Sequence, residues 1–220
     1  MRLMIAVPTH DHVPALFSYD LAQMMCYIGA NYVGPDQPIK AVSLTYVTGT
    51  LIHTARNDLA RMALDAEADF ILWLDSDMRF PKDLPIRLMK HRKDIVGINY
   101  SSRGVPPRFV AIKTIKPKER LVTGPESTGL EEVDALGFGA VLIRVSAVRK
   151  MVEDHPDKNL FWFGVNEEGG MVGEDVWFCT MAKSSGFEVF VDHDLSKECA
   201  HVGTLEYLLD HAQVMADEEE

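Results

Sequence analysis

Two kinds of apolar segment alternate along the first 80 residues. Residues 2–7 and 70–74 are almost continuously apolar, as in strands buried on both faces of a sheet, and residues 39–47 form a further strand that alternates with polar positions. Between these strands, residues 14–30 and 51–66 repeat apolar side chains at helical spacing. The order strand, helix, strand, helix, strand predicts a doubly wound α/β sheet.

Beyond residue 80 the pattern continues with shorter elements. We expect strands at residues 94–98, 140–145 and 187–191, and helices at residues 84–91, 146–153, 174–183 and 204–215. Ser146 is expected to be the N-cap of its helix. Residues 99–132 are rich in Ser, Gly, Pro, Lys and Arg and have only weak strand signals, at 109–112 and 120–123. A segment this long and irregular inside a compact domain is more often functional or mobile than structural.

The chain therefore reads as one α/β domain over residues 1–216, with an acidic tail over residues 217–220. The net charge is −11, which argues against a general nucleic-acid-binding protein because phosphate backbones require a basic surface. No apolar run approaches the roughly 18–20 residues that span a bilayer, so no membrane partner is expected. Cys26, Cys179 and Cys199 are widely spaced without a C-x-x-C pair, which is typical of free thiols in a cytoplasmic protein.

Candidate chemistry begins at Asp75-Ser76-Asp77, directly after the buried strand at residues 70–74. Ligands of open α/β sheets bind at the carboxyl ends of the strands. A carboxylate pair at this edge is placed to hold a hard divalent cation, which prefers oxygen ligands. A polar turn that merely closes the strand is the simpler alternative. Further polar groups follow other predicted strands or begin a helix, at Thr9–His12, Asp192–Asp194, Glu174-Asp175 and His201.

Several short motifs, taken in order and spacing, resemble those of GT-A glycosyltransferases, in particular the small family-2-like enzymes that use nucleotide-diphosphate sugars. The motifs are Pro8-Thr9, Ala55-Arg56-Asn57, Ile71 through Asp77, Gly137-Phe138-Gly139-Ala140, Gly173-Glu174-Asp175-Val176-Trp177-Phe178 and the late His201. No single motif is specific, but together they extend over nearly the whole chain. The resemblance implies a single Rossmann-like domain with a mostly parallel central sheet flanked by helices.

The resemblance also implies roles for the acidic motif. Asp77 would bind Mn²⁺ or Mg²⁺, Asp75 would contact the metal or the ribose, and His201 would be a further metal ligand. The cation would neutralise the charge that grows on the departing nucleotide. For a lone histidine a structural role is the commoner outcome, and this alternative stays open. The residues that would line the pocket of a UDP- or GDP-sugar are Pro8, Thr9, Arg56, Asn57, Asp75, Ser76 and Gly139.

Glu174 and Asp175 carry the expected catalysis. In inverting members of the family an acid of this motif removes the proton of the acceptor hydroxyl, which assigns Asp175 as the base and Glu174 as an acceptor or sugar contact. Acids are also enriched in the first turn of helices simply to complement the helix dipole. Trp162, Phe163 and Trp177 form either a stacking face for a sugar or part of the core. Inversion or retention of stereochemistry is left open.

The expected activity is thus transfer of a hexosyl-type sugar to an unidentified hydroxyl acceptor, with the oligomeric state undetermined. A first alternative is a two-metal hydrolase that uses His10, His12, Asp75, Asp77 and His201. A nucleotidyltransferase is disfavoured because residues 8–14 contain neither Gly nor Lys. A non-catalytic sugar-binding relative of the GT-A enzymes is the third alternative.

Overall fold

A seven-stranded mixed sheet forms the centre of the molecule. The computed structural model describes residues 1–104, 106–165 and 170–203. The strand order is β2–β1–β3–β9–β5–β12–β8, and the bounds are β1 (Arg2–Pro8), β2 (Ala41–Val47), β3 (Phe70–Leu74), β5 (Ile95–Gly97), β8 (Leu130–Val133), β9 (Ala140–Arg144) and β12 (Val189–Asp192). Strands β1, β2, β3, β5 and β12 run in one direction, and β8 and β9 run in the other. The mostly parallel sheet expected from the sequence is confirmed.

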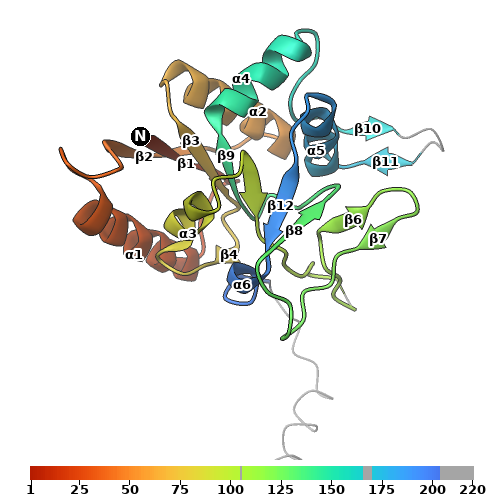
Figure 1. Ribbon diagram of the computed structural model, residues 1–220, viewed down its shortest axis with the longest axis horizontal. Helices are drawn as coiled ribbons and strands as arrows, with labels where there is room; N and C mark the ends of the chain where they lie inside the picture. The colour runs from red at the N-terminus through yellow and green to blue at the C-terminus, as the bar shows by residue number, and fades with distance from the viewer. Residues whose placement is uncertain (105, 166–169, 204–220) are drawn as a thin grey trace, which may run out of the picture.

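Helices cover both faces of this sheet (Figure 1). One layer contains α1 (Ala15–Tyr32), α3 (Leu84–Lys90) and α6 (His193–Ser196), and the other contains α2 (Ile52–Asp65), α4 (Val145–Asp154) and α5 (Glu174–Ser184). Strand β3 supplies both cores, because Phe70, Leu72 and Leu74 face the first layer while Ile71 and Trp73 face the second. Burial on both faces explains why this strand has no polar position.

Three two-stranded pairings lie outside the main sheet. They join β4 (Met78–Arg79) with β13 (Ala200–His201), β6 (Ile112–Thr114) with β7 (Glu119–Arg120), and β10 (Gly164–Val165) with β11 (Met171–Val172). The β6–β7 and β10–β11 hairpins project on the same side of the molecule (Figure 1). The first pairing places His201 beside the loop after β3, where the amide of Val202 donates to the carbonyl of Asp77 at 2.7 Å.

The prediction that Ser146 is the N-cap of its helix is wrong. Helix α4 begins one residue earlier, and its capping position is Arg144, which has no side-chain cap. The strand leads directly into the helix, and the amide of Val145 donates to the carbonyl of Asp69 at 3.0 Å, so a backbone group satisfies a donor that a capping serine would otherwise serve. The expected helix at residues 204–215 and the acidic tail at 217–220 lie outside the described residues.

The irregular segment at residues 99–132 contains more structure than its composition indicates. It holds the β6–β7 hairpin and most of β8, although the weak strand signals at 109–112 and 120–123 only overlap these strands. Cys26, Cys179 and Cys199 are all free thiols. Within the described ranges, no helix is both long and apolar enough to cross a bilayer.

Candidate functional site

A cavity of about 490 Å³ opens at the carboxyl ends of β1 and β3. This is the edge where ligands bind in open α/β sheets. The sequence-predicted residues that line the cavity are Pro8, Thr9, Arg56, Asp75, Ser76, Asp77, Glu174 and His201, and they are joined by His10, Thr50, Leu51, Ile52, Ala55 and Arg103. The fold thus gathers residues from both ends of the chain around one space.

Arg56 forms ion pairs with two acids of the site. It lies on the buried face of α2 and is only 3% exposed. Its Nη1 donates to Oε1 of Glu174 at 2.6 Å, and its Nη2 donates to Oδ1 and Oδ2 of Asp75 at 2.8 and 3.2 Å. The guanidinium also lies 5.0 Å from the ring centroid of Phe138. Burial alone would lower the pKa of Arg56, but Asp75 and Glu174 outweigh it and raise that pKa, so the cation is retained.

Asp75 is fixed by the backbone as well as by Arg56. Its amide donates to the carbonyl of Gly139 at 3.0 Å, one residue beyond the end of the β3–β9 pairing, and its carbonyl accepts from the amide of Met78 at 3.1 Å. Burial raises the pKa of Asp75, and the neighbouring Asp77 and Glu174 act in the same direction against the opposing effect of Arg56. The carboxylate therefore depends on Arg56 for its charged state.

Asp77 forms a separate cluster with His201 and Arg103. Its Oδ2 lies 3.3 Å from Nε2 of His201 and 3.1 Å from Nη1 of Arg103. Burial would raise the pKa of Asp77, but the hydrogen bond from His201 and the charges of His201 and Arg103 lower it. Nδ1 of His201 lies 3.0 Å from the carbonyl of Ser101. Because a carbonyl and a carboxylate only accept, both ring nitrogens donate in the protonated imidazole, and the hydrogen bond to Asp77 raises the pKa of His201.

Tyr100 supports this cluster from behind. Its ring packs edge-on against the His201 ring at 5.2 Å, and its hydroxyl accepts from the amide of Gly139 at 3.2 Å. Burial raises the pKa of Tyr100 above its usual range, which keeps the hydroxyl neutral. A Cβ at Gly139 would lie 2.7 Å from the Tyr100 ring, and a Cβ at Gly137 would lie 2.6 Å from its hydroxyl. The two glycines thus leave room for the Tyr100 side chain. Gly139, which was expected to line the nucleotide pocket, is not among the residues that line the cavity.

The donor set around Asp77 fits a divalent cation. A carboxylate oxygen of Asp77 and an imidazole nitrogen of His201 lie 3.3 Å apart at the cavity wall, and Mn²⁺ accepts both ligand types. Hard cations commonly take only one or two protein carboxylates and complete their shell with phosphate oxygens and water. Asp75 is turned toward Arg56 instead, and the described part of the chain contains no cluster of three or more His, Cys, Asp and Glu side chains suited to a metal.

The two predicted catalytic acids begin α5 and face different surroundings. Glu174 lines the cavity and pairs with Arg56. Asp175 is partly buried, and its Oδ1 accepts from the amide of Val176 at 2.7 Å. Burial raises the pKa of Asp175, and the negative charge of Glu174 adds to this effect. A Cβ at Gly173 would lie 2.8 Å from Oδ1 of Asp175, so the glycine leaves room for this carboxylate to fold over its own helix terminus.

Asn57 is placed away from the cavity. Its side-chain amide donates to the carbonyls of His53 and Phe161, both at 2.8 Å, and its Oδ1 accepts from the amide of Phe161 at 3.1 Å. These bonds join α2 to the segment before β10. The position of Asn57 in the motif is thus accounted for by packing, since its polar groups are satisfied within the protein.

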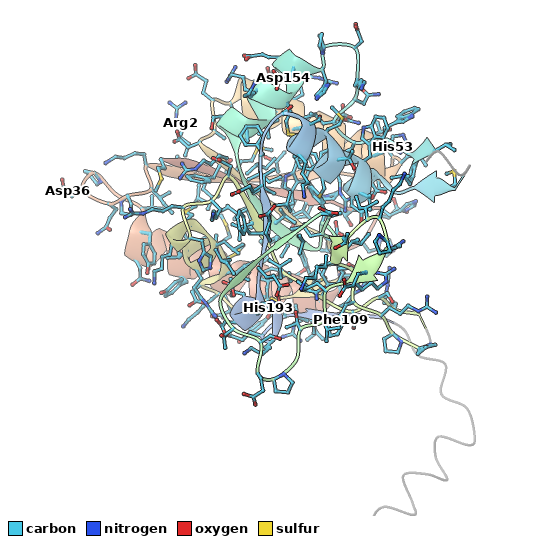
Figure 2. All side chains as sticks on the ribbon, turned by 45° about the vertical axis from the view of Figure 1, so that its right-hand side comes forward. Arg2, Asp36, His53, Phe109, Asp154 and His193 are labelled. Atoms are coloured by element: carbon cyan, nitrogen blue, oxygen red, sulfur yellow. The ribbon has the colours of Figure 1, made fainter. Side chains whose placement is uncertain are left out.

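The aromatic residues divide between the core and the surface. Phe161 is fully buried, whereas Trp162 is 47% exposed and Phe163 is 39% exposed. Both exposed rings pack edge-on against His53, which Figure 2 shows beside the β10–β11 hairpin. Trp177 is partly buried and donates to the carbonyl of Asn159 at 3.1 Å.

The histidines of the hydrolase alternative are not assembled into one site. His10 borders the cavity, but its side chain is exposed and pairs with Asp11 at 2.8 Å. His12 is exposed and is not among the residues that line the cavity. The structure does not favour two metals held by His10, His12, Asp75, Asp77 and His201.

Sequence reasoning missed Arg103 and Tyr100. Arg103 lies in the basic, irregular segment after β5, where a single arginine has no distinguishing pattern. Tyr100 lies two residues after the strand predicted at residues 94–98, near the start of that irregular segment. The only available signal for Tyr100 was the pair of glycines at 137 and 139, which indicated that something bulky approaches the backbone there.

Taken together, the sheet and the helix layers define an α/β protein with a GT-A-like fold. One similar solved structure is A197 from STIV, with a TM-score of 0.57, 13% identity, and coverage of 94% of this chain and 99% of that chain. Another is GalNAc-T7 with UDP, GalNAc and Mn²⁺, with a TM-score of 0.53, 9% identity, and coverage of 94% of this chain but 44% of that chain. At these identities the likeness concerns the fold alone. No family model and no curated protein sequence matches the chain.

Proposed function

We propose that this protein is a metal-dependent glycosyltransferase that moves a sugar from a UDP- or GDP-sugar to a hydroxyl acceptor. The observation that carries the proposal is the pairing of Asp77 with His201, 3.3 Å apart, at the wall of the cavity at the carboxyl ends of β1 and β3 in a GT-A-like fold. The neighbour GalNAc-T7 was solved with UDP, GalNAc and Mn²⁺, which supports a nucleotide sugar and a cation as the ligands of the corresponding edge here. The cavity volume of about 490 Å³ falls within the range of small-molecule sites.

Asp77 and His201 would hold Mn²⁺ or Mg²⁺. When bound, such a cation neutralises charge on the diphosphate of the donor, as a Lewis acid. To bind the cation, His201 would lose the proton on Nε2, while its Nδ1–H would still donate to the carbonyl of Ser101 and orient the ring. Arg56 keeps Asp75 and Glu174 in place, so that these acids can accept hydrogen bonds from hydroxyl groups of the sugar or ribose.

Asp175 would act as the general base. In the transfer step, the acceptor oxygen bonds to the anomeric carbon of the sugar, the bond from that carbon to the diphosphate oxygen breaks with its electron pair, and the acceptor proton passes to Asp175. A base is most effective when its pKa approaches the working pH. Burial raises the pKa of Asp175 in that direction, while the helix N-terminus favours its ionised form.

A thermal-shift titration with UDP, GDP and ADP, each with and without Mn²⁺, tests donor binding. A ligand that binds only the folded state raises the melting temperature by mass action. At one hundred times its Kd, it adds about 2.7 kcal/mol to the free energy of unfolding. We expect a Mn²⁺-dependent shift with UDP or GDP that Asp77→Ala abolishes. Asp58→Ala is the matched control and keeps the shift, because Asp58 is a half-buried acid on α2 that pairs with Arg61 and does not line the cavity.

Asp175→Asn separates catalysis from donor binding. This variant should retain the nucleotide shift and lose transfer, measured as release of the nucleoside diphosphate in the presence of acceptor extracts. Transfer at the parent rate would refute the role of Asp175. A protein that binds UDP or GDP with Mn²⁺ but turns over no donor in any variant would instead be the non-catalytic sugar-binding relative.

A further inference from the structure

A second cavity, of about 450 Å³, lies on the side of the molecule where the two hairpins project (Figure 1). One wall comes from the turn of the β6–β7 hairpin and the other from β11 and the first turn of α5. Its lining residues are Ile112, Ile115, Lys116, Pro117, Lys118, Met171, Val172, Gly173 and Val176. Most of these side chains are apolar, whereas the lining of the first cavity includes three acids, two arginines and two histidines.

The two cavities share the N-terminus of α5. Glu174 lines the first cavity, whereas Gly173 and Val176 line the second. Asp175, the candidate base, lies between these residues in the same helical turn and is not itself among the residues that line either cavity. A molecule in the second cavity therefore lies against the turn that carries the base, and the donor cavity lies on the other side of that turn.

The chemistry of the second cavity indicates what it binds. Met171, which is 76% exposed, lines this cavity together with Ile115, Val172 and Val176, so the cavity offers apolar surface to a ligand. Lys118 borders the same cavity and has no ion-pair partner within the described ranges. Its ammonium group is therefore open to pair with an anionic group of a bound ligand.

We infer that the second cavity binds the acceptor, and that the acceptor combines an apolar ring or chain with an anionic group. The inference rests on the proposed function, because it assigns the acceptor of that same transfer. The apolar part occupies the space between Ile115, Val172 and Val176, the anion pairs with Lys118, and the hydroxyl is presented to Asp175. The step is the transfer described above: the hydroxyl oxygen gains the sugar, the hydroxyl proton goes to Asp175, and the nucleoside diphosphate leaves.

A fluorescence titration with 1-anilinonaphthalene-8-sulfonate tests this assignment on the full chain, because the probe joins aromatic rings to an anion. Met171→Glu places a like charge at the exposed mouth and should weaken probe binding about 10-fold or more. Lys118→Gln should weaken it several-fold. Val152→Asp, at an exposed valine of α4 outside the cavity, is the control and leaves binding unchanged. Both test positions are exposed, so the variants should fold.

Competition against the bound probe defines the acceptor class. We expect 4-hydroxyphenylacetate to displace the probe, its neutral amide to do so several-fold less well, and glucose not to displace it. Equal displacement by the acid and the amide would overturn the anionic part of the inference, and displacement by glucose would overturn the apolar part. Probe binding that neither Met171→Glu nor Lys118→Gln weakens would overturn the whole assignment.

The nucleotide shift with Mn²⁺, measured on the same variants, separates this inference from the proposed function. If Met171→Glu keeps the shift but loses probe binding, both ideas are supported. If the shift is present and the probe ignores the cavity variants, only the acceptor assignment fails. If the parent chain shows no shift with any nucleotide, the proposed function fails and the acceptor assignment fails with it.

Discussion

Arg56→Met tests the charge balance on which the site depends. The substitution keeps an unbranched side chain of similar reach over Phe138 and Phe161 but removes the guanidinium. Asp75 and Glu174 then lose the cation that bonds them at 2.8 and 2.6 Å, and their side chains are only 24% and 14% exposed. Two carboxylates would be left near one another with little solvent.

The expected loss of stability is large. Removing one partner of a buried ion pair typically costs about 3–5 kcal/mol because the remaining charge is uncompensated. For a chain of this size, such a change lowers the melting temperature by roughly 6–20 °C. Replacing all three charges together, in Arg56→Met with Asp75→Asn and Glu174→Gln, should recover about half of the loss or more, since a neutral set carries no uncompensated charge.

Chemical denaturation monitored by tryptophan fluorescence measures these differences as shifts in the midpoint. Arg61→Met is the matched control. It lies on the same helix, but its side chain is 69% exposed and pairs only with Asp58, so the change should stay within about 0.5 kcal/mol. If Arg56→Met were as mild as Arg61→Met, or if neutralising the two acids recovered nothing, the buried charge cluster would not be the stabilising feature that we describe.

Three further predictions concern single residues. Arg103→Gln should tighten binding of Mn²⁺ alone several-fold in calorimetry, because a cation beside Asp77 is removed, while weaker binding would refute this competition. Asn57→Leu should cost about 1–3 kcal/mol by leaving the amide of Phe161 without its acceptor, yet keep the nucleotide shift. Because the pKa of Asp175 is raised in the folded state, ionising it destabilises the native protein as pH increases. Asp175→Asn should therefore melt higher than the parent at pH 8, and the gain should disappear near pH 4, whereas a gain independent of pH would contradict that assignment.

The sequence predicted the elements that depend on local pattern. Strand β3 was readable because burial on both faces leaves an unbroken apolar run, and the long helix α2 was readable because its apolar side chains recur on one face. Asp75 and Asp77 could be placed at the ligand-binding edge because a strand end fixes its own position in an α/β sheet.

The direction of β9 could not be predicted in the same way. Its five residues, Ala140–Arg144, are buried at all but the last position, and such a strand has the same pattern whether it runs parallel or antiparallel. Contacts between distant segments were equally unreadable. Nothing in the local sequence of Asn57 indicates that its partner is Phe161, more than 100 residues away, or that Tyr100 fills the space left by Gly139.

The ion-pair partners of the three acids in the site explain why we propose a bound cation. Arg56 is shared by Asp75 and Glu174, so one cation faces two carboxylates and this group keeps a net negative charge when both are ionised. The charge of Asp77 is compensated by its described partners His201 and Arg103. The Arg103 side chain is 55% exposed, so replacing its ion pair with Asp77 costs little free energy. A nucleoside diphosphate would bring further negative charge to this wall, and one exposed arginine is a weak counter-charge in water. A divalent cation held by Asp77 and His201 supplies what the side chains lack, which is why we expect nucleotide binding to require it.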